Sequence, residues 1–238
     1  MNNIRSKGAK ATALVFHGGT ARFHGMAGSA FRMFELGIMP SPADLQIGSS
    51  AGSIVEILSN MFELEDPAIL AKVESRVRSI SGIVKPWSSL LRYSKSRRGM
   101  ALDLKKFNDS IFADLPVRSN FLERMSENLM LITSGRLADD GYIPALTSSK
   151  QIAKIEDRNV ALSRMLRAAE ISCTMPPLLR PHIHPESGET YADGGLPGHP
   201  RQGHENFGEK WETDLALAIM PRGSTIFVFD PLPSGKRM

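Results

Sequence analysis

The sequence contains one cysteine, Cys173, among 238 residues. A single cysteine excludes an internal disulfide and has no partner at metal-site spacing, so we expect an intracellular, cytoplasmic protein. Long apolar runs are also missing, and none approaches the ~20 residues that span a bilayer. Residues 1–19 place basic side chains before an apolar run, but this run is too short for the core of a secretory signal and predicts a first β-strand.

A strong excess of one charge is absent as well. The net charge is +4 and the isoelectric point is near 9.3, which favours acidic partners without identifying them. Hydrophobic residues make up 42% and charged residues 23%, close to the averages of globular proteins. The length fits one core better than two, so we expect a single domain over residues 1–238.

Strand and helix patterns alternate along the chain, which predicts an α/β fold with a mostly parallel sheet. Apolar runs at 11–17 and 45–47 predict strands, and each is followed by a glycine-rich turn and a helical pattern. We expect a mostly helical insertion over residues 66–150, although 127–135 resembles a buried strand. The expected elements of the second half are a helix at 157–172 and a short helix and a strand within 214–231.

The stretch "IGSSAGS" places Ser50 between Gly48 and Gly52, in the pattern G-x-S-x-G. In this pattern a serine lies on a sharp turn from strand to helix, where side chains two residues away on either side would clash. The free N–H groups of the helix N-terminus favour negative charge beside the hydroxyl. Ser50 is therefore a candidate nucleophile, although a tight turn of small residues would have the same pattern.

Two further motifs carry the chemistry that a nucleophilic serine needs. In "HGGTARFHG", after the first strand, the N–H groups of Gly18 and Gly19 can approach an oxyanion closely. In "YADGGLPGHP", Asp193 stands on a tightly turned loop and can accept the serine proton if burial raises its pKa. The structural alternatives are a plain turn after a strand and a hairpin turn.

Together the three motifs, in this order, resemble the patatin-like phospholipase family. The similarity covers residues 14–58 and 162–200, including "AAEISCTMPPLLRP" before the aspartate, and the middle of the chain is unmatched. The resemblance implies a three-layer α/β/α sandwich and hydrolysis of lipid acyl esters by a Ser-Asp dyad, with no cofactor or metal. Ser50 looks like the nucleophile and Asp193 like its partner. The oxyanion hole that the resemblance implies consists of Gly18, Gly19, Thr20, Arg22 and Ala51.

Two departures from the family pattern keep another function open. Thr20 stands where the family has a third glycine, and Phe23 stands where it has the glycine after the arginine. Both restrict or crowd the oxyanion loop. The alternative is a catalytically impaired module of the same fold that binds lipid or protein.

The histidines offer a mechanistic alternative. Ser50, Asp193 and either His199 or His204 occur in the chain order of an α/β-hydrolase triad. His182 and His184 have no further ligand cluster and are interpreted as loop residues rather than metal ligands. His17 and His24 flank the oxyanion loop, where we expect surface or supporting roles.

Basic and apolar side chains alternate in residues 76–98, "RVRSISGIVKPWSSLLRYSKSRR". Such a segment is typical either of a solvated helical cap or of peripheral contact with an anionic membrane. The partners we expect are a phospholipid or other acyl ester substrate and this membrane contact, with no nucleic acid and no metal.

Overall fold

The structure is a computed structural model, and it describes residues 11–18, 23–37, 43–80, 111–139, 141–176, 181–185, 187–196 and 211–230. The described strands form one sheet in the order β5-β6-β3-β2-β1-β7, with β4 paired to β3. The strands are β1 Thr12–Phe16, β2 Leu45–Ser49, β3 Leu129–Ala138, β4 Gly141–Ser148, β5 His182–Ile183, β6 Thr190–Ala192 and β7 Thr225–Phe229. The helices are α1 Phe23–Glu35, α2 Ala51–Met61, α3 Pro67–Ile80, α6 Phe121–Glu127, α7 Ser149–Ile152, α8 Arg158–Ser172 and α9 Trp211–Ile219.

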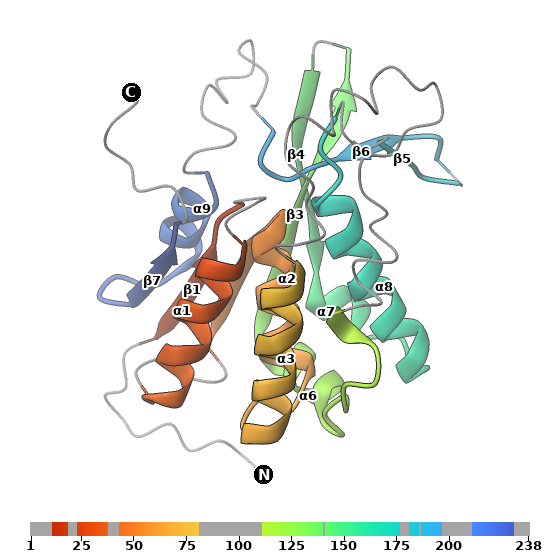
Figure 1. The fold of residues 1–238 in the computed structure, drawn as a ribbon. Helices are drawn as coiled ribbons and strands as arrows, with labels where there is room; N and C mark the ends of the chain where they lie inside the picture. Colours follow the sequence, from red (N-terminus) through yellow and green to blue (C-terminus); the bar gives the residue numbers. More distant parts are fainter. Residues whose placement is uncertain are drawn as a thin grey trace, which may run out of the picture.

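The fold has three layers, with helices on both faces of the sheet (Figure 1). A hydrophobic core lies on each face of the sheet. Residues of β1 belong alternately to one core and the other, because successive side chains of a strand point to opposite faces. Leu14 and Phe16 pack with the helices α1, α2 and α8, whereas Ala13 and Val15 pack with Ala216 of α9. The expected three-layer α/β/α fold with a mostly parallel sheet is confirmed.

The helix α2 occupies the centre of the first layer. All of its residues are buried, from Ala51 to Met61. Its polar side chains therefore need partners inside the protein, and Asn60 and Gln46 of β2 exchange two side-chain hydrogen bonds of 2.7 and 2.9 Å. The C-terminal end of α2 is thus fixed to the start of β2.

The expected helical insertion at 66–150 differs from the structure in its last part. Residues 67–80 and 121–127 are helical, but β3 and β4 follow and both belong to the central sheet. Pro144 lies inside β4, where it pairs with Gly135. A proline is tolerated there because β4 pairs only with β3 within the described residues, so the side that lacks an N–H needs no partner.

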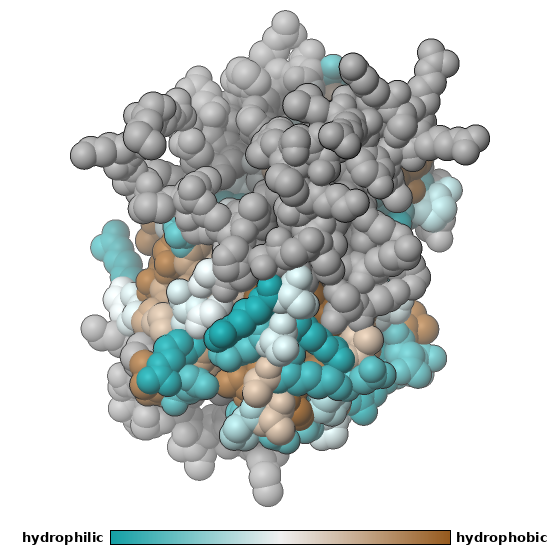
Figure 2. Space-filling model, in the orientation of Figure 1, coloured by the Kyte–Doolittle hydropathy of each residue, from teal (hydrophilic) through white to brown (hydrophobic). Residues whose placement is uncertain are grey.

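Among the residues that the structure describes, exposed hydrophobic side chains do not identify a membrane face. The exposed large ones are scattered over several elements, from Leu36 after α1 to Val228 in β7. Figure 2 shows hydrophilic and hydrophobic residues intermingled on the described part of one face. Across the described ranges, no helix has the length and apolar character needed to cross a bilayer.

Candidate active site

Ser50 has an unusual backbone conformation. Its φ is 49° and its ψ is −126°, and only Asp114 shares a positive φ among the non-glycine residues that the structure describes. Such a conformation costs on the order of 1–3 kcal/mol and persists only where the surroundings impose it. Ser50 is also the N-cap of α2, yet its side chain makes no capping hydrogen bond. Its hydroxyl is thereby available to another partner.

The two glycines of the motif are required by close backbone contacts. A Cβ atom added to Gly52 would lie 2.1 Å from the carbonyl oxygen of Phe16 in β1. A Cβ atom added to Gly48 would lie 2.6 Å from Cα of Ser53. Both distances are far below van der Waals contact, so α2 can approach β1 and β2 this closely only with glycine at both positions.

Strand β3 explains why Ser50 and Asp193 meet. β2 runs parallel to β3 as far as the pair Ser49 and Thr133, and β6 runs antiparallel to β3 as far as the pair Ala192 and Gly135. Because β4 overlaps both stretches of β3, it takes one edge of β3 and leaves the other edge to β2 and β6. The next residue of each strand, Ser50 or Asp193, is therefore directed to the same point.

The hydroxyl of Ser50 donates a hydrogen bond of 2.7 Å from Oγ to Oδ2 of Asp193. The N–H of Gly195 donates one of 2.7 Å to Oδ1 of the same carboxyl group. Asp193 is 1% exposed, and this burial raises the pKa of its carboxyl group to about 6, although both hydrogen bonds lower it. Above pH 6 the carboxylate is ionised and far more basic than an ordinary aspartate, as proton transfer near neutral pH requires.

The end of α8 ties the two motif turns together. The N–H of Ser50 donates to Oγ of Ser172 at 2.7 Å, and the N–H of Gly194 donates to the carbonyl oxygen of Ser172 at 3.1 Å. The N–H of Asp193 donates to the carbonyl oxygen of Thr174 at 2.8 Å. Sequence reasoning gave Ser172 and Thr174 no role, and the only signal was their place in "AAEISCTMPP", shortly before the aspartate.

Two of the predicted oxyanion-hole residues lie in the described part of the chain. Gly18 approaches Ser50 so closely that an added Cβ would lie 3.0 Å from Cβ of Ser50. Ala51 is the first residue of α2, where no carbonyl of the helix can accept its N–H. Gly19, Thr20 and Arg22, and with them the effect of Thr20 and Phe23 on the loop, lie outside what the structure describes.

The described histidines do not enter the dyad. His17 Nε2 lies 2.9 Å from Oγ1 of Thr213, and His182 Nδ1 lies 2.7 Å from a guanidinium nitrogen of Arg167. His184 Nδ1 accepts from the N–H of Ser187 at 3.3 Å. His199, His204 and the side chain of His24 are outside the described residues. Within the described ranges, no group of three or more His, Cys, Asp or Glu side chains could hold a metal ion.

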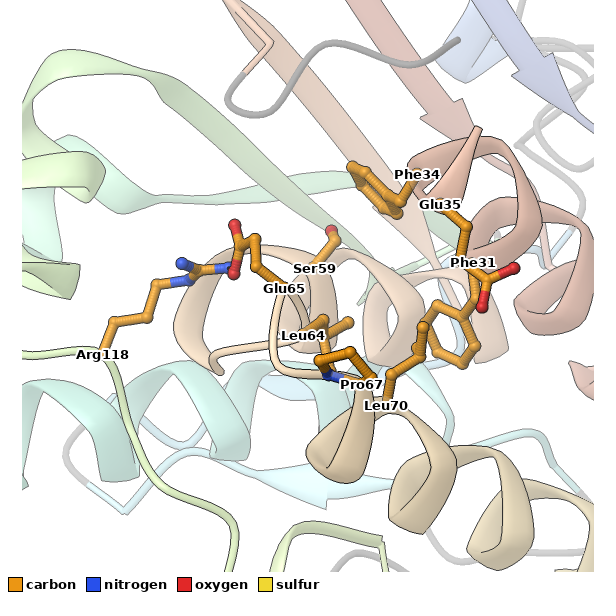
Figure 3. A pocket seen from close by; sticks show the side chains of 9 residues that line it. All are labelled: Phe31, Phe34, Glu35, Ser59, Leu64, Glu65, Pro67, Leu70 and Arg118. Carbon is orange, nitrogen blue, oxygen red and sulfur yellow. The ribbon is translucent and has the colours of Figure 1, made fainter. Parts of the chain in front are cut away.

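A cavity of about 460 Å³ lies at the far end of α2. Its lining includes Ser59, nine residues along the helix from Ser50, or roughly 14 Å at 1.5 Å per residue. Figure 3 shows Phe31, Phe34 and Leu70 around it, with the ion pair of Arg118 and Glu65 at one side. This cavity is separate from Ser50 and Asp193.

No protein-family model matches the chain, and no curated protein is similar enough to match it. Among solved structures the chain is similar to the crystal structure of VipD from Legionella pneumophila, with a TM-score of 0.41 and 11% sequence identity. This likeness covers 79% of the present chain and 46% of the VipD chain, so the chain spans less than half of that protein's length. A likeness at this level carries no functional argument, and the case for a function rests on the geometry of Ser50 and Asp193.

Proposed function

We propose that the protein is a serine acyl hydrolase that cleaves lipid acyl esters through a dyad of Ser50 and Asp193. The observation that carries this proposal is the 2.7 Å hydrogen bond from Ser50 Oγ to a buried Asp193 carboxylate, formed at a strained strand-to-helix turn. A buried carboxylate of raised pKa beside a serine hydroxyl is costly for a purely structural protein. The choice of lipid esters rests on the resemblance of the three motifs to patatin-like phospholipases.

The reaction proceeds through an acyl-enzyme. Oγ of Ser50 attacks the ester carbonyl carbon while Asp193 takes the hydroxyl proton, and the carbonyl electron pair moves onto oxygen. N–H groups of Gly18, Gly19 and Ala51 stabilise this oxyanion. The carbonyl re-forms as the alcohol leaves with the proton from Asp193. Water then attacks the acyl-enzyme, gives its proton to Asp193 and releases the carboxylic acid, and Ser50 recovers its proton.

The experiment is hydrolysis of p-nitrophenyl butyrate together with covalent labelling by a fluorophosphonate. We expect Ser50→Ala to lose both turnover and labelling, and Asp193→Asn to lose turnover. Ser59→Ala is the matched control, because Ser59 lies on the same helix at its far end. A wild-type protein that neither turns over nor labels would contradict the proposal and favour the non-catalytic module.

The triad alternative is tested with the same assay. The dyad needs no histidine, so His199→Ala and His204→Ala are each expected to keep wild-type turnover. A loss of turnover in either variant, with retained folding by circular dichroism, would replace the dyad by a Ser-Asp-His triad. Incubation with mixed phospholipids, followed by analysis of the released fatty acids, would identify the ester that is cut.

A further inference from the structure

Three neighbouring strands place polar side chains in one row behind the dyad. Ser49 pairs with Thr133 across β2 and β3, and His17 follows the pair of Phe16 and Gly48 across β1 and β2. Because side chains alternate between the faces of a sheet, His17, Ser49 and Thr133 point to the face covered by α9, opposite α2. All three are buried.

Glu212 of α9 lies over this row. Its carboxyl oxygen Oε2 is 3.6 Å from Nδ1 of His17, and its side chain is 1% exposed. Thr213, the next residue of the helix, contacts the other nitrogen of the same ring at 2.9 Å. Helix α9 therefore contacts the imidazole of His17 at both of its nitrogens, with a hydrogen bond at one of them.

Several atoms of this cluster have no hydrogen-bond partner among the described residues. They are Ser49 Oγ, Thr133 Oγ1 and Glu212 Oε2, and all three are inaccessible to solvent. A buried polar group without a partner costs on the order of 1–3 kcal/mol, so apolar side chains would make a more stable core here. A polar cluster kept at such a cost beside a reactive serine indicates a functional role.

The row touches the turns that carry all three motifs. His17 directly precedes Gly18, and Ser49 directly precedes Ser50. A Cβ atom added to Gly194 would lie 2.4 Å from Oγ1 of Thr133, so the aspartate turn packs directly against the row. The N–H of His17 also donates to the carbonyl oxygen of Phe229 at 3.0 Å, which fixes its backbone to β7.

We propose that Glu212 is a positioning residue for the dyad, whose carboxyl group, packed against His17, keeps the row behind the three motif turns in its working arrangement. This inference rests on the proposed function, since it concerns the regulation of the same site by pH.

The charges around Glu212 agree with such a role. Within the described ranges, the titratable groups that act on Glu212 are His17 after β1, Asp193 after β6 and Asp230 after β7. Burial raises the pKa of Glu212 to about 7, and the negative charges of Asp193 and Asp230 raise it further. Burial lowers the pKa of His17, while Asp230 raises it.

The raised pKa values of Asp193 and Glu212 predict how the rate of hydrolysis depends on pH. Asp193 must be ionised to accept the serine proton, so activity rises as pH passes about 6. Above about 7, ionised Glu212 adds a second negative charge behind the site where the negative oxyanion forms, and activity falls. We therefore expect a bell-shaped profile with its maximum between the two pKa values.

The test compares the pH profiles of kcat/KM for wild type and Glu212→Gln between pH 5 and 9. At pH 9, about two units above the pKa of Glu212, an inactive ionised form would place wild-type kcat/KM about 60-fold below its maximum near pH 6.5. Glu212→Gln cannot ionise and is expected to keep the rise near pH 6 but lose the fall. Asp214→Asn, an exposed carboxylate of the same helix, is the control and should keep both limbs.

A second measurement does not depend on activity. The ring signals of His17 in an NMR titration are expected to shift at the pH where Glu212 ionises, and this shift should disappear in Glu212→Gln. If the variant does not fold, the wild-type data decide, because the midpoint of the His17 shift must match that of the falling limb.

The outcomes separate the two proposals. A falling limb that survives in Glu212→Gln, or midpoints that differ in wild type, would overturn the role of Glu212 while leaving the dyad intact. A coupled His17 shift in a protein without esterase activity would instead overturn the proposed hydrolysis and leave the contact between Glu212 and His17 standing.

Discussion

Gly52 lies where the first turn of α2 crosses the end of β1, and an alanine at this position tests how closely the two elements approach. The added Cβ would lie 2.1 Å from the carbonyl oxygen of Phe16, 2.6 Å from its carbonyl carbon and 2.8 Å from the carbonyl oxygen of His17. Carbon and oxygen atoms in contact are normally about 3.3 Å apart. The two elements would therefore have to separate by about 1 Å.

The separation cannot be absorbed locally, because β1 is hydrogen-bonded to β2 on one side and to β7 on the other. Overpacking against backbone of this kind costs about 3 kcal/mol or more. With a denaturant slope of about 2–3 kcal/mol per molar in urea, Gly52→Ala should lower the unfolding midpoint by about 1 M or more. Fluorophosphonate labelling of Ser50 should weaken in parallel, since the same turn carries the serine.

Gly28→Ala is the matched control. Gly28 lies inside α1, and an added Cβ there meets no atom within 4 Å. Replacing an unneeded glycine in a helix stabilises by about 0.5–1 kcal/mol, so the midpoint should rise slightly. If Gly52→Ala unfolded at the same urea concentration as wild type, the close crossing of α2 and β1 would be refuted.

Three further predictions concern the dyad, its support and its surroundings. Asp193 has a folded-state pKa of about 6 against 3.8 unfolded, so the folded protein binds its proton more tightly and loses up to about 3 kcal/mol of stability as pH rises through this range. Asp193→Asn should therefore be more stable than wild type at pH 7, as measured by chemical denaturation, while it hydrolyses no ester. Equal or lower stability of this variant would contradict a buried, ionised Asp193. Ser172→Ala removes the acceptor for the N–H of Ser50 and should lower the free energy of unfolding by about 1–3 kcal/mol. It should also lower kcat more than it raises KM. Unchanged kinetics would show that this hydrogen bond does not hold the turn. Residues 76–98, of which only 76–80 are described, are proposed to bind anionic membranes; co-sedimentation with anionic liposomes should decrease at high salt, and indifference to both lipid charge and salt would count against it.

Local patterns were sufficient to predict the core elements and the strained turn. The apolar run of β2 and the small residues after it identify a strand-to-helix turn, because only glycine at positions 48 and 52 permits the close crossings. The helix at Arg158–Ser172 was expected at 157–172, and Asp157 caps it by accepting the N–H groups of Asn159 and Val160. Such features depend on neighbours within a few residues.

The remaining features depend on contacts between distant parts of the chain. The hydrogen bond of Ser50 to Ser172 joins residues 122 apart, and the one to Asp193 joins residues 143 apart. Nothing in the local sequence around Ser172 distinguishes its hydroxyl from that of any serine at a helix end. Glu212 was missed for a similar reason, since a charged residue on a short helix normally faces solvent, and only the sheet packing shows that it is buried.

Strands β2 and β6 pair with the same edge of β3, and this shared edge determines where the chain can gain or lose residues. The distance between Ser50 and Asp193 is set by two adjacent registers on a single strand, and not by the 143 residues that separate them in sequence. Insertions or deletions between the elements leave this distance unchanged as long as the registers stay. A shift of β6 by one residue along β3 would move Asp193 by about 3.3 Å and turn its side chain to the opposite face. The chain is thus tolerant to changes in its connecting segments and intolerant to a slip in three residues of β6.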